Sequence, residues 1–480
     1  MRKKRNIYKF IINYIPYVVL LVFISLLLSR NSQYKINIEL NDNFDITTSI
    51  EGELINNCYK NLYNVQDEKK VYENKNGRLE IIKRTFDNDD IMIFYSLDSK
   101  TPTTAVIKLN KKIFKIKSLE EYEIEKEYSN ITGYDSTSIP AYYIEFESGG
   151  SALISKNYLY NVLYKKYNNN QISRLRSLIR EEDSRVNQKT GSIETAAIKG
   201  HADGWILLSN EKLFISDEDI QQYADMLNNK PVVSAWLTSE GQYTKIPYSI
   251  EPYTKEGYSR NPGANHGKEE LYMYEQVGKR IYYDLMWNKV MGLYNMPRDE
   301  SGVWYTEYTS TYISIPFGVV APFVDTRHNE NITQFLNMIG NKYNIEDLKE
   351  ASLYYPDYIV SEVKKENYIY VSEGAFLIPD YFKYDDTKKT HASINHQLGT
   401  ANVLLQTYAK TNNRNYYNAG MSILRGLEGI NDKWLREDGD LWYRMNPDFT
   451  FEGTDYKTLT LNDLLVVQET LELIGENKCK

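Results

Sequence analysis

Cysteine and histidine are scarce in this 480-residue chain. It has two cysteines, Cys58 and Cys479, and five scattered histidines without an HExxH motif. Two cysteines cannot build a disulfide framework, and no Cys/His quartet with zinc-finger spacing is present. The sequence therefore excludes a disulfide scaffold and a zinc finger, and we expect neither a metal nor another cofactor.

Several sequence motifs of catalysis and nucleotide binding are also missing. The chain has no GxSxG around a serine nucleophile, no P-loop and no GxGxxG. Beyond residue 32 it carries 51 basic against 65 acidic side chains, a formal charge of −14. An acidic body argues against a nucleic-acid partner, because binding to phosphates requires a surplus of Lys and Arg.

Tyrosine and apolar residues are abundant. The chain has 43 tyrosines beside 15 phenylalanines and 6 tryptophans, and 42% of its residues are apolar. That composition and length predict one or two folded domains with a sizeable core. Tyrosine, glutamate, arginine, asparagine and a few histidines are residue types that suit acid–base chemistry on a carbohydrate.

The N-terminus contains a long apolar run. Residues 10–28 are mostly apolar, with Asn13 and Pro16 as the main interruptions, and the basic sequence RKKR precedes them. About 20 such residues cross a bilayer, and a basic flank stays in the cytoplasm. We predict that residues 1–32 form a cytoplasmic tip and a signal-anchor transmembrane helix, with a single-pass protein in the cell membrane and its body outside the cytoplasm. A cleaved signal peptide is the alternative, and it also exports the body.

Residues 33–155 alternate between apolar and polar positions. Segments such as YKINIEL, GRLEIIKRTF and AYYIEFES are separated by clusters of Asp, Asn, Gly and Ser, a pattern typical of strands. We predict a β-rich domain here, a β-sandwich or barrel that ends near Gly149 and Gly150.

Residues 156–480 change to a helical period. Amphipathic runs are found at 169–186, 217–229, 268–294, 331–343, 393–410, 415–428 and 462–474, and Ser216 with Asp219 resembles a capping box before the second run. Six or more such helices favour an α/α toroid as the catalytic domain. The fold class predicted for the whole chain is therefore α+β and multidomain.

The C-terminal region resembles the heparan/heparosan D-glucuronyl C5-epimerases. Residues 454–464, TDYKTLTLNDL, are similar to their Asp-Tyr-His-Thr-Thr-His-Ile-Asn-Gln-Leu stretch, and residues 441–444, LWYR, to their Tyr-Asp-Leu-Arg segment. Residues 395–427 are similar to the helical hairpin of that family. Lys457 and Thr460 replace the two histidines of the first stretch.

A third motif of that family has two counterparts in this chain. Residues 304–309, WYTEYT, are similar to its Trp-Tyr-Glu-Glu-Tyr-Pro-Thr stretch, but lie about 85 residues before the hairpin that should follow closely. Residues 379–384, PDYFKY, compete as the counterpart. The second choice would leave Glu307 and Tyr308 without a role carried over from the family.

The resemblance implies an isomerase that inverts C5 of D-glucuronate in a uronic-acid polysaccharide. The catalytic residues that we predict are Tyr443, Tyr456, Glu307 and Tyr308. The predicted substrate-binding residues are Arg444, Lys457, Asn462, Asn395, His396, Trp304 and Trp442. A homodimer is a further expectation.

The chemistry of this reaction restricts the residue types that can perform it. Removing the C5 hydrogen places charge on the adjacent carboxylate, which needs a cation or strong donors. Inversion needs one group on each ring face, one to take the proton and the other to return one. Tyrosine has a pKa near 10, so a tyrosine base needs nearby positive charge. If residues 441–445 form a strand, Tyr443 and Arg444 point to opposite sides, and that charge comes from elsewhere.

Two other functions remain open. A polysaccharide lyase would share the proton abstraction, with Asn395 and His396 as its neutraliser and base. A non-catalytic envelope protein would instead use its tyrosines to stack on sugars. Chain shortening with an unsaturated product distinguishes the lyase from the epimerase, and a lack of any turnover indicates the binding protein.

Overall fold

The computed structural model describes residues 36–477 apart from 42–43, 49–52, 110, 130–132, 137–138, 196–197, 231–233, 248 and 384–388. The membrane anchor predicted at residues 1–32 lies outside this part of the chain. Within it, no helix is both long and apolar enough to cross a bilayer.

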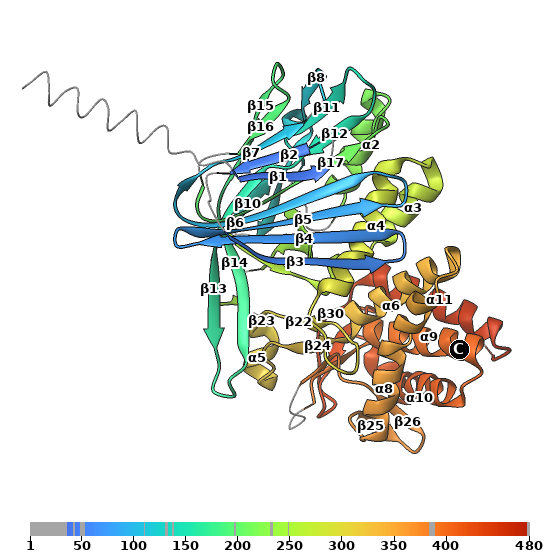
Figure 1. The fold of residues 1–480 in the computed structure, drawn as a ribbon. Coiled ribbons are helices and arrows are strands. Elements are labelled where there is room, and N and C mark those ends of the chain that lie inside the picture. The colour runs from blue at the N-terminus through green and yellow to red at the C-terminus, as the bar shows by residue number, and fades with distance from the viewer. Residues whose placement is uncertain are drawn as a thin grey trace, which may run out of the picture.

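A large antiparallel sheet dominates the first half of the molecule (Figure 1). Thirteen of the described strands belong to it. In spatial order ten of them are β18 (Ala235–Thr238), β19 (Gly241–Lys245), β21 (Gly257–Arg260), β14 (Ile172–Glu182), β13 (Asn157–Lys166), β17 (Ile198–Ser209), β6 (Ile91–Thr103), β5 (Gly77–Phe86), β4 (Val65–Asn74) and β3 (Glu53–Leu62). A branch of three strands starts at β17: β12 (Ser151–Ile154) pairs with β17, β11 (Tyr142–Phe146) pairs with β12, and β8 (Ile113–Ser118) pairs with β11.

A second sheet covers one face of the large sheet. Its strands in spatial order are β1 (Ile36–Asn41), β2 (Phe44–Thr48), β7 (Ala105–Leu109), β16 (Ser192–Glu194) and β15 (Arg185–Asn187). Ile107 and Ile193 from this sheet share one buried cluster with Ile81 and Ile93 of the large sheet. The region thus has two β layers around an apolar core, and β9 (Glu125–Ser129) with β10 (Gly133–Ser136) forms a separate pair.

Helices cover the other face of the large sheet. Ile82 and Phe94 follow Ile81 and Ile93 along their strands, so their side chains point to the opposite side. There they join the core of α2 (Asp217–Asn228), α3 (Lys268–Val277) and α4 (Arg280–Asn295), which includes Trp287. The predicted capping box of α2 is confirmed, because Ser216 and Asp219 bond each other's backbone N–H.

A buried ion pair also joins the sheet to the helices. Arg84 on β5 is fully buried and pairs with Asp67 of β4 at 2.7 Å. Its guanidinium also donates a hydrogen bond to Asn288 on α4. The large sheet and α4 therefore share polar contacts as well as an apolar core.

The remaining helices form the second half of the molecule. They are α5 (Thr311–Phe317), α6 (Thr326–Lys342), α7 (Glu346–Ala351), α8 (Tyr354–Lys364), α9 (Ile394–Thr411), α10 (Arg414–Ile430) and α11 (Lys457–Leu473). Short 3-10 turns are η1 (Glu120–Tyr122), η2 (Pro262–Ala264) and η3 (Asn431–Trp434). The helices predicted at 331–343, 393–410, 415–428 and 462–474 are confirmed as α6, α9, α10 and α11. Whether the helices close into a toroid remains a prediction.

Small sheets connect these helices and carry the candidate site. The pairs and triplets are β20 (Ile250–Glu251) with β23 (Thr309–Ser310), β22 (Tyr305–Thr306) with β24 (Phe323–Asp325) and β27 (Tyr381–Phe382), β25 (Ile369–Ser372) with β26 (Ala375–Leu377), and β28 (Ala392–Ser393) with β29 (Trp442–Met445) and β30 (Phe451–Thr454).

Two sequence-based expectations about helices are wrong. The run at 169–186 contains strand β14, paired with β13 and β21, so its apolar residues divide between two faces: Leu175 is buried while Ile172 is exposed. The helix predicted at 268–294 is two helices, because Gly278 ends α3 in the left-handed region with φ 65°. Glycine adopts that conformation without a steric cost.

The boundary predicted between residues 155 and 156 falls inside the large sheet. Gly149 and Gly150, with φ of 85° and 80°, form the turn of the β11–β12 hairpin instead of a linker. The strands after residue 156 continue the same sheet as far as Arg260. The β-rich part is therefore about twice as long as expected, because β13 and β14 extend it across the predicted boundary.

Candidate active site

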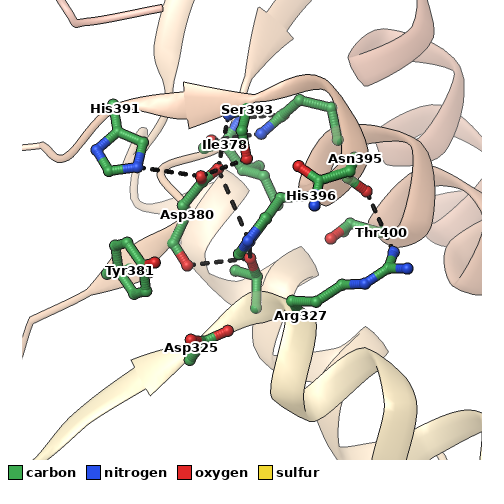
Figure 2. Close-up of polar contacts among 12 residues, drawn as sticks. Asp325, Arg327, Ile378, Asp380, Tyr381, His391, Ser393, Asn395, His396 and Thr400 are labelled. Carbon is green, nitrogen blue, oxygen red and sulfur yellow. Dashed lines mark hydrogen bonds and ion pairs between the residues drawn. The ribbon is translucent and has the colours of Figure 1, made fainter. Parts of the chain in front are cut away.

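Asp380 lies at the centre of a buried polar cluster between the starts of two helices (Figure 2). It immediately precedes β27, whose Tyr381 pairs in register with Asp325 at the end of β24. Asp325 caps the N-terminus of α6, and Ser393 at the end of β28 precedes α9. The short strands thus bring the first turns of α6 and α9 to the same carboxylate.

Four groups surround the Asp380 carboxylate. Ser393 donates its backbone N–H to Oδ1 at 2.9 Å and its hydroxyl to Oδ2 at 2.5 Å. His391 Nε2 lies 3.3 Å from Oδ2, and His396 Nδ1 lies 3.8 Å from Oδ1. Burial opposes ionisation of this carboxyl, but the two histidines and Ser393 outweigh it and hold the pKa of Asp380 below its usual value. Asp380 is therefore a carboxylate at neutral pH.

Thr326 selects the tautomer of His396. The Thr326 hydroxyl donates its single proton to the Asp380 carbonyl at 3.0 Å, and its oxygen lies 2.6 Å from His396 Nδ1. With the hydroxyl proton on the carbonyl, Nδ1 is the donor of the second contact, and the Asp380 carboxylate 3.8 Å from Nδ1 favours the same tautomer, which has its lone pair on Nε2. Burial outweighs the attraction of Asp380 and lowers the pKa of His396, so the ring is neutral. His396 thus has the form of a general base.

Aromatic rings surround His391. Its ring centroid lies 5.6 Å from Tyr312, 5.4 Å from Phe317, 5.6 Å from Tyr381 and 6.3 Å from Tyr443. Neither ring nitrogen of His391 has a well-aligned hydrogen bond among the described residues. Its orientation is therefore fixed by ring packing and by the Asp380 charge.

Tyr443 and Tyr456 meet edge to face at the rim of this cluster. Their ring centroids are 5.4 Å apart, with an interplanar angle of 83°. Tyr443 lies on β29 and is half-buried, while Tyr456 at the start of α11 is 60% exposed. Burial, with the charge of Asp380 as the next contribution, raises the pKa of Tyr443 far above 10. Tyr443 is therefore a protonated phenol, and a tyrosinate base at this position is not supported.

Arg444 brings positive charge to the same rim. Its guanidinium lies 4.7 Å from the Tyr312 ring centroid, and Nη2 pairs with Glu452 at 2.5 Å. Nη1 is buried without a hydrogen-bond partner among the described residues. Arg444 is therefore a cation at the rim with one donor that no described residue uses.

A second arginine near His396 is already engaged. Arg327 on α6 donates to Glu330 at 2.9 Å, to Asp463 on α11 at 3.0 Å and to the carbonyl of Asn395 at 3.3 Å. Burial raises the pKa of Glu330 to about 7, although Arg327 opposes that rise. Carboxylates thus take up the charge of Arg327, which ties α6, α9 and α11 together behind His396.

Five of the predicted site residues converge here. Tyr443, Tyr456 and Arg444 form the rim, and His396 contacts Thr326 at the centre. Asn395 is buried beside His396, with its side-chain Oδ1 unpartnered among the described residues. Their catalytic or binding roles remain predictions.

Three predicted residues on the segment around β22 lie elsewhere. Trp304 is fully buried and donates its indole N–H to the Leu293 carbonyl at 2.9 Å, so it has no surface for a polysaccharide. Glu307 pairs with Arg260 of the large sheet at 2.7 Å. Tyr308 packs on the small apolar cluster around Ile246. Glu307 and Tyr308 therefore lie apart from the Asp380 cluster, and their catalytic roles remain predictions.

The last three predicted residues lie at the surface next to the site. Lys457 is largely exposed and pairs with Asp440 at 3.0 Å. Asn462 is exposed on α11. Trp442 is half-buried beneath the guanidinium of Arg436. None of the contacts that the described residues make here joins these three to Asp380 or His396.

The sequence analysis did not identify Asp380 and His391 as site residues. Asp380 lies in the PDYFKY segment, which was considered only as an alternative to residues 304–309. His391 stands five residues before His396, and two of five histidines so close together are the signal that could have found it. Tyr312 and Thr326 carry no sequence signal of this kind.

Comparisons with known proteins give only distant likenesses. No protein-family model and no curated protein sequence matches the chain. Among solved structures, an alpha-amylase from Clostridium perfringens is similar with a TM-score of 0.34 at 12% identity, over 53% of this chain and 65% of that one. A sugar epimerase from a ruminal bacterium is similar with a TM-score of 0.33 at 13% identity, over 46% of this chain and 57% of that one.

A family 76 glycoside hydrolase from a bovine Bacteroides thetaiotaomicron strain gives a TM-score of 0.34 at 9% identity, over 80% of this chain and 73% of that one. The chain thus spans less than two thirds of the amylase and of the epimerase. The names of all three neighbours are those of enzymes that act on carbohydrates. Likeness at these scores does not assign fold or function to this chain.

Proposed function

We propose that this protein is a carbohydrate-active isomerase that inverts C5 of D-glucuronate residues in a polysaccharide. One observation carries the proposal: a neutral His396 with its Nε2 lone pair free of protein donors among the described residues shares a cluster with the protonated Tyr443. Epimerisation needs such a pair, one group that takes a proton and another that gives one.

In this mechanism the guanidinium of Arg444 binds the uronate carboxylate. His396 Nε2 removes the C5 hydrogen, the C5–H electron pair moves into the carboxylate, and Arg444 holds the charge that develops. Tyr443 then gives its O–H proton to C5 on the opposite ring face. Asp380, 3.8 Å from Nδ1, stabilises the imidazolium formed on His396. His396 then loses its extra proton to water and Tyr443 takes one up from water, so both residues return to their starting state and hydrogen from the solvent enters the product at C5.

The resemblance to the glucuronyl C5-epimerases supports this assignment when residues 379–384, PDYFKY, are taken as the counterpart of the family's Trp-Tyr-Glu-Glu-Tyr-Pro-Thr stretch in place of residues 304–309. Asp380 and Tyr381 of PDYFKY adjoin Tyr443, which belongs to the LWYR segment, whereas Glu307 is paired with Arg260 in the large sheet. Two of the motifs similar to that family therefore meet in space. Because the body carries a net negative charge, binding of an acidic polymer requires positive charge at the site, and Arg444 supplies it.

A lyase at the same site is the second candidate. The side chain of Asn395, buried next to His396, favours it, because its amide N–H groups can donate to a uronate carboxylate and offset its charge. Elimination would then follow the same proton abstraction and break the bond to the 4-O-linked sugar. The products separate the two reactions, since only the lyase shortens the chain.

The cellular location belongs to the same proposal. The apolar run at 10–28 and the basic residues before it would anchor the protein in the cell membrane with the body outside. There the active site would meet an extracytoplasmic polymer.

The test is incubation of the purified protein with heparosan in deuterated water. We expect deuterium at C5 of uronate residues by NMR, an unchanged chain length and loss of the exchange in His396→Gln. An unsaturated product with shortened chains would establish the lyase instead. Absence of exchange by folded protein, over a panel of glucuronate polymers, would overturn both enzymatic assignments.

A further inference from the structure

A second cleft lies between helix α8 and the segment that follows α4. Its volume is about 880 Å³, and we call it the α8 cleft. Tyr354, Tyr358, Ser361 and Lys365 line it from one face of α8, as their spacing of three or four residues requires. No member of the Asp380 cluster is among the described residues that line it. Clefts that bind small ligands measure about 300–1,000 Å³, so this one is large enough for a ligand of its own.

Arg298 lines the opposite wall of the α8 cleft as a cation without a counter-ion. Its guanidinium lies 5.1 Å from the ring centroid of Tyr294 and 5.2 Å from that of Trp304, which is itself fully buried. In the described part of the chain, no carboxylate or carbonyl accepts a hydrogen bond from this guanidinium. The two rings therefore hold in place a cation whose N–H groups remain available to a ligand.

The wall that carries Arg298 is fixed before any ligand binds. Asp299 Oδ1 accepts hydrogen bonds from the Ser301 backbone N–H at 2.9 Å and from the Ser301 hydroxyl at 2.5 Å. Gly302 donates its N–H to the Asp299 carbonyl at 3.1 Å and has a φ of 78°. A Cβ at Gly302 would lie 2.5 Å from the Tyr354 ring. Only glycine allows this close approach, which joins the loop to α8.

The polar groups that the α8 cleft leaves open are of both hydrogen-bonding kinds. Arg298 can only donate and Glu300 can only accept, while the hydroxyls of Tyr354 and Ser361 can do either. None of these four side chains forms a hydrogen bond with another side chain or carbonyl that the structure describes. A ligand rich in hydroxyl groups can satisfy all four, because each hydroxyl both donates and accepts.

The charges around the α8 cleft disfavour an acidic ligand. The lining contains two cations, Arg298 and Lys365, against three carboxylates, Asp299, Glu300 and Asp357. Lys365 also pairs with Glu362 at 2.8 Å, which leaves Arg298 as the stronger attraction for an anion. A polymer of uronates would therefore be repelled, whereas an uncharged sugar would not.

We propose that the α8 cleft is a second carbohydrate site, which binds neutral saccharide units. Arg298 donates to sugar hydroxyl oxygens, Glu300 accepts from sugar hydroxyls, and the C–H faces of the sugar rings lie against Tyr354 and Tyr358. This binding rests on the α8 cleft alone and does not depend on the C5 chemistry proposed for the Asp380 cluster.

The test is isothermal titration calorimetry of the full chain with four neutral hexasaccharides: cellohexaose, maltohexaose, mannohexaose and chitohexaose. We expect at least one of them to bind. Its affinity should fall about tenfold or more in Arg298→Met, which loses the guanidinium donors, and binding should be lost in Ser361→Tyr, whose ring fills the cleft. The matched control is Arg414→Met, because Arg414 on α10 also lies over two rings, those of Tyr408 and Tyr417 at 5.4 and 5.1 Å. This control should bind as the wild type does.

Two further measurements separate this site from the candidate active site. His396→Gln should bind the hexasaccharide with wild-type affinity, and Arg298→Met should retain both C5 exchange and the wild-type melting temperature. Lack of binding by the wild type across the four sugars, or equal affinity of the wild type and Arg298→Met, would overturn the proposal. Tighter binding of a heparosan hexasaccharide that is lost in Arg298→Met would also overturn it, because the cleft would then select an acidic ligand.

Discussion

Asp325 and Tyr381 are direct register partners across the β24–β27 pair, although 56 residues separate them in the chain. This pairing places the first turn of α6 beside the PDYFKY segment. As a result Thr326 reaches the Asp380 carbonyl and His396 together. The geometry of the candidate site therefore depends on a two-residue strand contact between distant segments.

Thr326→Val should disable the site while leaving the fold intact. Valine has nearly the same shape but cannot accept from Nδ1, so His396 can adopt either tautomer and presents its lone pair part of the time. We expect C5 exchange to fall about tenfold and the unfolding free energy to fall by about 1 kcal/mol. The matched control is Thr400→Val, which removes a buried hydroxyl that contacts Tyr355 instead of a histidine. Equal loss of exchange in both variants would contradict the tautomer assignment.

Tyr443→Phe should abolish proton return without weakening binding. The variant keeps the ring that packs on His391 and Tyr456 but lacks the O–H that supplies the proton. General acid catalysis of this kind contributes about 10²–10⁴-fold, so a loss of at least about 100-fold is expected. Equilibrium binding of the polymer should be unchanged. Tyr408→Phe on α9 serves as the control, and retention of full activity by Tyr443→Phe would remove Tyr443 from the mechanism.

Arg444→Met should weaken binding of the acidic polymer. The variant preserves most of the side-chain packing on Tyr312 but removes the Nη1 donor and its charge. Hydrogen bonds to charged groups contribute about 1.5–3 kcal/mol, which corresponds to a loss of affinity of roughly 10- to 100-fold. Arg436→Met removes a nearby arginine that stacks on Trp442 and is the control. Equal effects in the two variants would indicate general electrostatic attraction only.

His266 should make the protein less stable in acid. Burial, with the charge of Lys268 next, lowers the pKa of His266 to about 3, against 6.5 for a free histidine. Below pH 6.5 the unfolded chain binds a proton at His266 and the folded protein does not. The contribution of neutral His266 to the unfolding free energy is therefore present above pH 6.5 and is lost as pH falls toward 3. The contribution is about 1.4 kcal/mol per pH unit between these values.

His266→Phe should flatten that slope. Urea unfolding at pH 4.5, 5.5 and 6.5 measures the unfolding free energies, and the slope for the variant should be smaller by about one proton. The control His201→Gln alters a partly exposed histidine on β17. If the wild type and His266→Phe have parallel slopes, His266 is protonated in the folded protein.

Elements with a strong local pattern could be predicted from the sequence. The capping box of α2 and the helices α6, α9, α10 and α11 carry their signals within a few turns of chain. Strand β14 could not be predicted from the sequence, because its apolar residues have the spacing of one face of a helix. These residues are Ile172, Leu175, Leu178 and Ile179. Its conformation is decided by pairing with β13 and β21, which involves residues up to 82 positions away.

The candidate site was predictable at its rim and not at its centre. Tyr443, Tyr456 and Arg444 lie in motifs similar to a known family, and His396 is conspicuous in a histidine-poor chain. Asp380 and Thr326 acquire their importance only from tertiary contacts between the starts of α6 and α9. A buried carboxylate in a loop looks in sequence like any other aspartate, because its burial depends on strands that form elsewhere.

The contact of Arg84 with Asp67 and Asn288 bears on how the molecule unfolds. Splitting the sheet from the helices would expose this guanidinium pair and the shared core around Trp287 at once. The separation would break the hydrogen bond from Arg84 to Asn288, and a hydrogen bond to a charged group contributes about 1.5–3 kcal/mol, a sizeable part of the stability of a typical domain. Sheet and helices should therefore melt in a single transition. A fragment beginning at residue 268 should aggregate instead of folding, so the helical half cannot be studied without the β-rich half.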